Sequence, residues 1–313
     1  MRGKGEKEFF SEQRELGKMA IKREVFIKIK KHIPKKCWGM YVSYKYKKIM
    51  GKKCNLKNPR TYTEKIQWSK INRNDPMISR LSDKVAVRSW VEEKIGGEYL
   101  IPTIGKAYSS ANDIDYDSLP DSFVIKANHG SGLNVVVDDK KEISFDDIKD
   151  KANSWLKQNF AYNSFEMQYK DIRPQIYIEK NLLEDCEGDL PDYKFFCFGG
   201  KVYCLYVMID TYPIHTNAKL GIFDKNFNLL PYYRADFTPI TKQIEKPANY
   251  SKMIEIAEKL SEGFSHVRVD LYNVKGKIYF GEMTFLTGSG LFKHVPEEFD
   301  EILGNQWDLE SGI

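Results

Sequence analysis

Cysteine is scarce in this sequence and shows no pairing pattern. The 313 residues include five cysteines, an odd number, and no two of them form a Cys-x-x-Cys pair. This count argues against a disulfide framework and against a zinc site, and it is typical of proteins kept in a reducing cytoplasm. We therefore expect buried or free thiols at all five positions, which are Cys37, Cys54, Cys186, Cys197 and Cys204.

Long hydrophobic runs are also missing. A helix that crosses a bilayer needs roughly 18–20 apolar residues, whereas the most apolar stretch here, Val202–Ile209, has the length of a strand. The N-terminal end is dense in charge and contains no apolar core typical of a signal peptide. The sequence thus predicts a cytoplasmic protein, with any membrane contact limited to the inner face of the membrane.

Acidic residues are sparse at the N-terminal end. Residues 1–60 hold 19 Lys and Arg against 5 Asp and Glu, whereas residues 61–313 hold 30 against 39. The overall net charge of +5 therefore combines a basic head of +14 with an acidic body of −9. Such asymmetry between segments is informative about partners.

The basic head, residues 1–57, has the pattern of a helical extension in which apolar residues such as Phe26 and Ile29 are interleaved with lysines. Two interpretations remain open. The head can lie on an anionic membrane, where each well-placed Lys or Arg contributes about 1 kcal/mol, or it can be a solvated extension. We do not expect a nucleic-acid partner, because no recognition motif accompanies the charge and the body is acidic.

The body mixes strand and helix patterns and is rich in hairpins. Its composition, with 42% hydrophobic and 30% charged residues in the whole chain, is that of a globular protein with a real core. This organisation predicts an α+β fold and not a regular parallel α/β fold. We expect an early helix with Thr63 as its N-cap, helices at 84–91, 146–159 and 251–262, and strands at 122–127, 135–137, 175–179, 194–198, 202–209, 220–223, 267–272 and 277–285.

The last predicted hairpin carries the most informative side chains. Because side chains alternate faces along a strand, Arg268 and Asp270 share one face of its first strand, and Glu282 and Thr284 share one face of its second. In an antiparallel pair without a bulge, a loop centred near Lys275 or Gly276 places all four side chains together in either register. Two carboxylates, a cation and a hydroxyl suit Mg²⁺ with an anionic substrate. The alternative is a solvated face with a cross-strand ion pair.

A lysine precedes a glycine-rich turn in the middle of the chain. Lys126 ends an apolar strand, and His129-Gly130-Ser131-Gly132 follows it. Glycine lets backbone N–H groups approach a phosphate closely, and lysine supplies a point charge for a phosphate oxygen. The Walker pattern is absent. An ordinary hairpin turn, with His129 bonded to the backbone, is the alternative.

A third segment is a weaker candidate, for an adenine site. The strand that ends at Glu179 runs into an apolar stretch through Leu182, and Asp192 and Lys194 open the next strand. Backbone groups in such a connection between two strands can imitate a base pair toward adenine.

Taken in order, these segments resemble the ATP-grasp superfamily, and most of all its TupA-like branch, which is associated with teichuronopeptide and other bacterial surface polysaccharides. The likeness extends over residues 58–310. The segments that carry it are Asn58–Trp68, Ser82–Arg88, Leu119–Gly132, Asp192–Phe198, Val267–Tyr272 and Tyr279–Phe285.

The resemblance implies an ATP-grasp fold, in which two α+β lobes hold ATP between antiparallel sheets, preceded here by a basic helical N-terminal extension. It assigns Mg²⁺ to Asp270, Glu282 and Thr284, and catalysis to Arg268 and Lys126. Thr284 stands where many members have asparagine, which leaves the number of Mg²⁺ ions open. By position, the resemblance assigns ATP binding to Lys84, Lys126, His129, Gly130, Ser131, Gly132, Glu179, Lys180, Leu182, Asp192 and Lys194.

The same resemblance implies four regions and an activity. The regions are the basic extension at 1–57, a helical region leading into the first lobe at 58–120, a nucleotide-binding lobe at 121–182, and a C-terminal lobe with the Mg²⁺ site at 183–313. The implied activity is an ATP-dependent carboxylate–amine ligase that attaches an amino acid to a uronic-acid or similar carboxyl of a surface polysaccharide precursor. A phosphotransferase on the same scaffold and a non-enzymatic basic binding protein are the alternatives.

Overall fold

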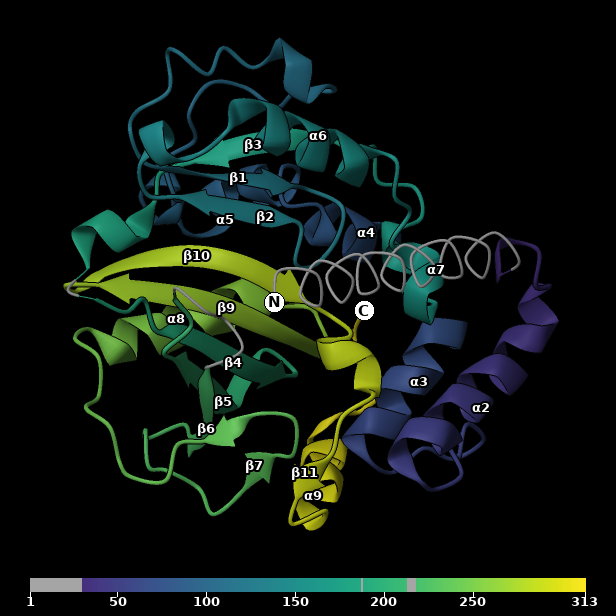
Figure 1. Cartoon of the computed structure of the whole chain (residues 1–313). Coiled ribbons are helices and arrows are strands. Elements are labelled where there is room, and N and C mark those ends of the chain that lie inside the picture. The colour runs from purple at the N-terminus through teal and green to yellow at the C-terminus, as the bar shows by residue number, and fades with distance from the viewer. Residues whose placement is uncertain (1–29, 187, 213–217) are drawn as a thin grey trace, which may run out of the picture.

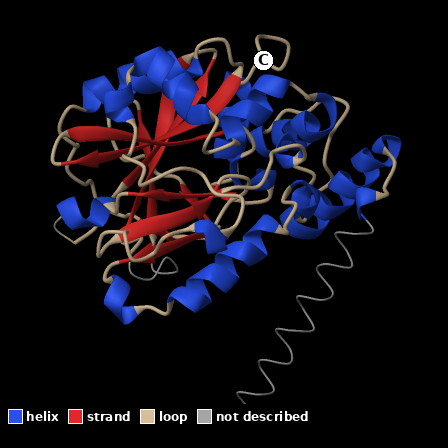
Figure 2. Cartoon of the chain, turned by 90° about the horizontal axis from the view of Figure 1, so that it is seen from above, coloured by secondary structure: helices blue, strands red, loops and turns tan. Residues whose placement is uncertain are grey.

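The computed structural model describes residues 30–186, 188–212 and 218–313 of the chain. Its strands form two large sheets, and in Figure 1 the smaller sheet lies above the larger one. Seen from above, helices surround the strands (Figure 2). No helix in the described part of the chain is long and apolar enough to cross a membrane. The part of the predicted basic extension that precedes residue 30 lies outside the described residues.

Helices make up about half of the described residues before the first strand. The N-cap of α3 (Tyr62–Asn72) is Thr61 and not Thr63 as we expected, because Thr61 Oγ1 accepts a hydrogen bond from Glu64 N while the Glu64 carboxylate accepts one from Thr61 N. This reciprocal pair is a capping box. The helical elements are η1 (Lys35–Cys37), α2 (Trp38–Met50), α3 (Tyr62–Asn72), α4 (Pro76–Ser82), α5 (Val87–Ile95), η2 (Gly97–Tyr99) and η3 (Ala111–Asp113).

The smaller sheet has three antiparallel strands in the order β2–β1–β3: β2 (Asn134–Val137), β1 (Phe123–Ala127) and β3 (Ile176–Glu179). Helix α6 (Phe145–Leu156) packs against β1, and Phe123, Ile148 and Trp155 are buried together between them. Four short elements connect this sheet to its surroundings: η4 (Lys140–Glu142), α7 (Ala161–Ser164), η5 (Met167–Tyr169) and η6 (Leu182–Asp185).

The larger sheet has six strands in the order β10–β9–β4–β5–β6–β8. Their bounds are β4 (Asp192–Phe198), β5 (Lys201–Ile209), β6 (Lys219–Asp224), β8 (Thr238–Pro239), β9 (His266–Val274) and β10 (Lys277–Thr284). The remaining elements are the strands β7 (Tyr233–Arg234) and β11 (His294–Val295), which pair with each other, and α8 (Tyr250–Ser261), η8 (Thr287–Gly290) and α9 (Glu298–Gln306).

The two faces of the larger sheet have different environments. Helix α8 packs on β9, β4 and β5, and the odd-numbered residues Val267 and Val269 of β9 lie in the same buried core as α8. Because successive side chains alternate faces, the even-numbered residues of β9 point to the other side. His266, Arg268 and Asp270 therefore follow one another along the face that α8 does not cover.

The register of the β9–β10 hairpin contains a bulge. Near the turn, Tyr279 pairs with Tyr272 and Phe280 with Leu271, whereas beyond the bulge Glu282 pairs with Asp270. The shift occurs at Gly281. A Cβ atom added to this residue would lie 3.1 Å from Asp270 O. Our assumption of a hairpin without a bulge is thus wrong. The predicted grouping is nevertheless present, because the bulge restores the register that pairs even-numbered residues.

Helix α3 is held against α9, and this contact leads to a prediction about Gly304. A Cβ at Gly304 would overlap the carbonyl oxygen of Arg60 and approach Thr61 Cα to 2.9 Å. Overpacking of this kind against backbone is costly. We expect Gly304→Ala to lower the free energy of unfolding by roughly 2–4 kcal/mol in urea titrations.

Gly39 in α2 is the matched control for that prediction. A Cβ there would meet Leu56 Cδ1 at an ordinary 3.6 Å, and alanine is the better helix former by about 1 kcal/mol. We expect Gly39→Ala to be neutral or stabilising. Equal unfolding midpoints for Gly304→Ala and the unchanged chain would contradict the close α3–α9 approach.

Candidate active site

A cleft with about 670 Å³ of open space lies between the two large sheets. Its walls come from β1, β2 and β3 of the smaller sheet, from the turn after β1, and from β4, β9 and β10 of the larger sheet. The positions of the sequence-predicted residues can therefore be compared with the walls of this cleft.

One row of charged residues crosses three neighbouring strands of the larger sheet. Glu282 of β10 is directly opposite Asp270 of β9, and Asp270 is directly opposite Lys194 of β4. Lys194 Nζ donates to Asp270 Oδ2 over 2.8 Å and also to Asp192 Oδ2. All four of these side chains line the cleft. The residues come from separate parts of the sequence, and the strand order β10–β9–β4 brings them together.

Arg268 links both carboxylates of β9 and β10. Its Nε and Nη2 donate to Asp270 Oδ1 and Oδ2 over 2.7 Å and 2.6 Å, and Nη2 also reaches Glu282 Oε1 at 3.1 Å. Thr284 Oγ1 accepts from Arg268 over 3.0 Å and donates to Glu282 over 2.9 Å. Arg268 and Thr284 do not line the cleft. They lie behind the two carboxylates and hold them in position through these hydrogen bonds.

The surrounding charges keep Glu282 ionised. Burial opposes ionisation of this carboxyl, but Lys84, Arg268 and Lys194 outweigh burial and lower its pKa to about 2. Burial likewise opposes the charge on Lys194, and the carboxylates of Asp192 and Asp270 outweigh it and raise the lysine pKa. This wall thus presents fixed charges of both signs near neutral pH.

The opposite wall carries a second row. Lys126 of β1 is paired with Asn134 of β2 on one side and with Tyr177 of β3 on the other, and all three line the cleft. Lys126 Nζ donates to Glu179 Oε2 over 2.7 Å, and Arg88 Nη1 approaches Glu179 Oε1 at 3.3 Å. The buried Glu179 therefore holds two cations and lies behind the cleft wall.

Lys84 reaches the cleft beside the glycine-rich turn. Its Nζ donates to Gly130 O over 2.6 Å, and it lies 3.7 Å from Glu282 Oε2. Gly132 has φ of +71° and no atom within 4 Å of a Cβ built there, so its left-handed backbone explains the need for glycine. Gly130, Ser131 and Gly132 line the cleft between the two walls.

Some predicted ATP contacts lie elsewhere. His129 is buried, with its ring nitrogens 3.0 Å from Trp155 O and 3.2 Å from Asn128 Oδ1, and burial lowers its pKa. Lys180 pairs with Asp185 at 2.7 Å, and Leu182 packs in a small buried cluster. These three residues and Glu179 do not line the cleft, and their roles toward ATP stay predictions.

Other residues of the cleft were missed from the sequence. Tyr177 and Tyr272 line it from opposite sheets, as do Asn134 and Gly281. Arg88 belongs to the segment Ser82–Arg88 that carries the family resemblance, but it received no role of its own. Its partner Glu179 lies 91 residues later in the chain, so sequence spacing did not connect the two. Strand alternation points from Glu179 to Tyr177 and from Asp270 to Tyr272 as neighbours on the same face, and these were the available signals.

The carboxylates fit Mg²⁺ when part of its coordination comes from phosphate. The described residues contain no group of three or more His, Cys, Asp or Glu that would hold a metal alone, and Mg²⁺ in phosphate sites typically uses one or two carboxylates. Among the described residues, buried Asp192 Oδ1 has no hydrogen-bond partner. Arg268 bonds both oxygens of Asp270, whereas within the described part of the chain Glu282 Oε2 has only the ion pair with Lys84 at 3.7 Å. Glu282 is therefore the more available ligand.

Solved structures of several ligases are similar to this chain. One is D-alanine–D-alanine ligase from Bacillus anthracis, at 18% identity and TM-score 0.39 over 66% of this chain and 58% of that one. Another is L-amino acid ligase from Bacillus licheniformis, at 17% identity and TM-score 0.44 over 73% of this chain and 50% of that one. In both cases the chain spans less than two thirds of the solved structure's length.

Protein-family comparison gives the decisive match. No curated protein sequence matches the chain. The family model described as TupA-like ATPgrasp matches residues 64–308, which is most of the chain. The resemblance inferred from the motifs is confirmed by this match, and with it the ATP-grasp fold class. The chain belongs to the TupA-like ATP-grasp family.

Proposed function

We propose that the chain is an ATP-dependent carboxylate–amine ligase that works through an acyl phosphate. The observation that carries the proposal is the cleft itself, with Lys126 and Lys84 near the glycine-rich turn and Asp270 and Glu282 on the facing sheet. Lysines and glycine backbone suit phosphate groups, and the carboxylates suit the metal ion that accompanies them. This chemistry requires no residue of the chain to act as a covalent nucleophile.

The proposed chemistry has two steps. A substrate carboxylate oxygen attacks the γ-phosphorus of ATP, the bond to the β-phosphate oxygen breaks, and ADP leaves. An amine then attacks the carbonyl carbon, the amine loses a proton, and inorganic phosphate leaves with the former carboxylate oxygen. Bound Mg²⁺ would supply charge neutralisation for the phosphates.

The residues of the chain contribute positioning and charge. Lys84, Lys126 and Lys194 would bind phosphate oxygens, and Gly130 to Gly132 would cover them. Arg268 would hold Asp270 and Glu282 in place from behind the cleft wall and add positive charge near the oxygens of the acyl phosphate. Asp270 and Glu282 would hold the metal ion, with Thr284 bonded to Glu282. Such catalysis is mostly orientation and electrostatics.

For substrates, we propose an amino acid as the amine and a uronic acid or similar carboxyl of a surface polysaccharide precursor as the acceptor. The resemblance to the TupA-like branch supports this choice. The test is a panel of amino acids and uronic acids assayed with ATP and Mg²⁺ for ADP release, with products identified by mass spectrometry. ADP with an amide supports the ligase, ADP with a phosphoester favours the phosphotransferase, and no ADP with any pair contradicts both.

Hydroxylamine separates the two steps. If an acyl phosphate forms, hydroxylamine attacks it in place of the amine and gives a hydroxamate. We therefore expect hydroxamate and ADP from ATP, Mg²⁺, a uronic acid and hydroxylamine with no amino acid present. Amide formation without any hydroxamate would argue against the acyl phosphate.

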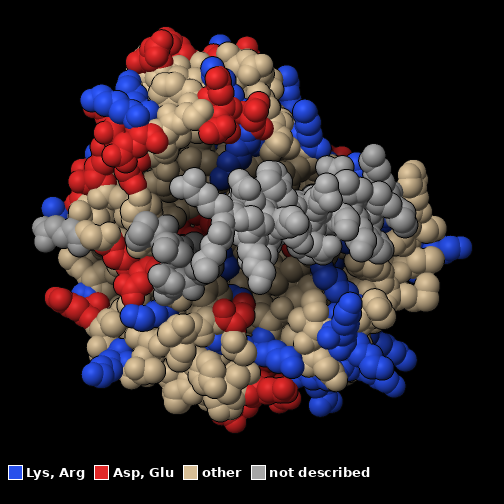
Figure 3. Space-filling model, viewed as in Figure 1, with Lys and Arg blue, Asp and Glu red and all other residues tan. Residues whose placement is uncertain are grey.

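We also propose that α2 contacts an anionic membrane on the inner face. Residues 30–60 contain eleven Lys and Arg and no Asp or Glu. Met40, Tyr44 and Ile49 of this helix are 69%, 67% and 42% exposed. Lys and Arg side chains gather at the lower right of Figure 3, where Figure 1 places α2. Exposed apolar side chains among lysines suit a lipid surface.

Vesicle binding tests this surface. We expect the full chain to sediment with vesicles of phosphatidylcholine mixed with phosphatidylglycerol, and not with phosphatidylcholine alone. Met40→Ser combined with Tyr44→Ser should weaken the binding by roughly tenfold or more, because two apolar side chains no longer enter the lipid. Tyr233→Ser is the control, since Tyr233 is 37% exposed on β7. Equal binding to both kinds of vesicle would contradict the proposal.

A further inference from the structure

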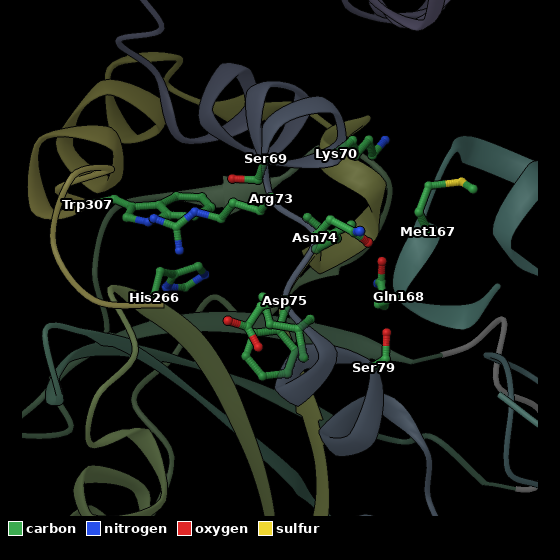
Figure 4. A pocket seen from close by; sticks show the side chains of 13 residues that line it. Ser69, Lys70, Arg73, Asn74, Asp75, Ser79, Met167, Gln168, His266 and Trp307 are labelled. Carbon is green, nitrogen blue, oxygen red and sulfur yellow. The ribbon is translucent and has the colours of Figure 1, made fainter. Parts of the chain in front are cut away.

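Figure 4 shows a second pocket, which has about 480 Å³ of open space. Its walls come from the end of α3, the start of α4, η5, the first residue of β9, the segment after β10 and the residue after α9. None of the residues proposed to bind ATP or Mg²⁺ lines this pocket. Its position and its polar groups indicate what it binds.

The pocket opens on the same sheet face as the carboxylates. His266 lines it, and His266, Arg268 and Asp270 alternate along one face of β9. Residues two apart on a strand are about 7 Å from each other. Phe285, which follows Thr284 at the end of β10, also lines the pocket. A molecule in this pocket thus lies at the His266 end of the sheet face that carries Arg268 and Asp270.

Arg73 and Ser69 are the polar groups on the α3 side. Arg73 Nη2 donates to Leu309 O over 2.9 Å, its guanidinium carbon lies 6.0 Å from the Trp307 ring, and the described residues give it no ion pair. Ser69 is 5% exposed, and its Oγ is buried without a hydrogen-bond partner among the described residues. Figure 4 shows Arg73 extending toward Trp307 and His266. Among the described residues, the half-buried Arg73 thus has guanidinium nitrogens that form no ion pair, and the buried Ser69 hydroxyl has no partner of the kind that burial calls for.

Two other groups on the wall are already engaged. Lys70 Nζ donates to Ser289 O, Ser289 Oγ and Gln67 Oε1 over 2.6, 2.7 and 3.0 Å, which uses its three protons. Those bonds hold a turn in which Ser289 has φ of +57°. His266 Nδ1 lies 2.8 Å from Cys197 O and Nε2 lies 2.9 Å from Tyr62 O–H, and burial lowers its pKa to about 3. Neither group is a free cation for a ligand.

A carboxylate faces the same space. Asp75 lines the pocket, and its Oδ1 accepts from Met77 N over 2.7 Å as the N-cap of α4. Figure 4 shows the Asp75 carboxylate pointing toward the side of the pocket where His266 lies. Arg73 and Asp75 together complement a molecule that carries a carboxylate and an ammonium. A uronic acid carries the carboxylate alone, and apolar walls from Ile78 and Leu286 leave room for a side chain.

We propose that this pocket binds the amine substrate as a free amino acid, with its carboxylate on Arg73 and Ser69 and its ammonium on Asp75. The inference rests on the proposed ligase function and gives the amine substrate of its second step a binding site. The arrangement places that substrate at the His266 end of the sheet face that also carries Asp270. Arg73 and Asp75 are binding residues in this scheme, and Lys70 positions the turn after β10.

Thermal unfolding of the full chain with Mg²⁺ and a non-hydrolysable ATP analogue tests the proposal. The probes are the twenty common amino acids in both L and D forms, their decarboxylated amines, and D-glucuronate, each added singly. We expect at least one amino acid to raise the unfolding temperature while its decarboxylated amine does not. Arg73→Gln should weaken that amino acid's affinity by roughly 10–100-fold, because it removes a charge-assisted hydrogen bond. Asp75→Asn, which preserves the helix cap, should weaken it by roughly tenfold.

Arg80→Gln is the matched control, because Arg80 is an exposed arginine of α4 that does not line the pocket. The amino-acid affinity should be unchanged in this variant. The proposal is overturned if no amino acid raises the unfolding temperature, if the effect survives in Arg73→Gln, or if D-glucuronate and not an amino acid depends on Arg73. Failure of the ligase proposal is a separate outcome, seen as Arg73-dependent amino-acid binding without ADP release from any acceptor.

Discussion

Glu282→Gln is expected to lower ADP release by roughly a thousandfold while the chain stays folded. Glu282 lines the cleft, and Arg268 and Thr284 bond its Oε1 while its Oε2 faces Lys84 at 3.7 Å. The amide keeps the shape and the hydrogen bonds to Thr284, but it loses the charge that would hold Mg²⁺. Steady-state ADP release at saturating Mg²⁺ measures the effect, and circular dichroism checks the fold.

Two comparisons make the Glu282 result interpretable. Glu301→Gln removes the same charge from an exposed position on α9 and should leave ADP release unchanged. Because Glu282 has a pKa near 2, its charge is constant across ordinary assay buffers, so the ratio between Glu282→Gln and the unchanged chain should not vary between pH 6 and 8. Turnover within tenfold of the unchanged chain would remove Glu282 from the metal site.

The grouping of the β9–β10 residues shows how far strand alternation reaches. Alternation alone predicted that Arg268, Asp270, Glu282 and Thr284 share a face, and their hydrogen bonds agree. The reasoning assumed a regular hairpin, whereas the observed register changes at Gly281. A bulge depends on how β9 and β10 pack within the whole sheet, so a local pattern does not encode it unambiguously.

The sequence analysis mainly failed to predict contacts between residues that lie far apart in the sequence. Lys194 was expected as a nucleotide contact, but its pairing with Asp270 depends on β4 lying beside β9, 76 residues later in the chain. His129 followed a phosphate-loop pattern, yet its ring bonds Trp155 O of α6. Local sequence signals predict elements and turns well, whereas strand order and helix packing decide which side chains share a cavity.

The second pocket could not have been predicted from the sequence for the same reason. Ser69 and Arg73 lie on or directly after α3, which the sequence predicted only as an early helix, and Trp307 lies more than 230 residues later. They come together because α3 packs against α9, where Gly304 permits the backbones to touch. The same contact that makes Gly304→Ala destabilising therefore also builds one wall of the pocket.

Arg268→Met is expected to destabilise the chain by roughly 3–5 kcal/mol and to abolish ADP release. Arg268 is 8% exposed and bonds both oxygens of Asp270, which is itself 2% exposed. Removal of the guanidinium leaves a buried carboxylate with Lys194 as its remaining cation. Breaking a buried ion pair on one side is costly because the other charge stays desolvated. Urea titration measures the stability, and ADP release is measured at a temperature where the variant is folded.

A double-mutant cycle separates this desolvation from catalysis. Asp270→Asn removes the charge that Arg268→Met leaves unpaired, so the double variant should lose less stability than the two single losses added together. Arg268→Lys keeps a positive charge but cannot bond both Asp270 oxygens in a fork, so it should recover part of the stability and little of the activity. Additive stability losses would show that Arg268 and Asp270 do not depend on each other. Full activity in Arg268→Lys would reduce the role of Arg268 to a point charge, since any cation at that position would then support the reaction.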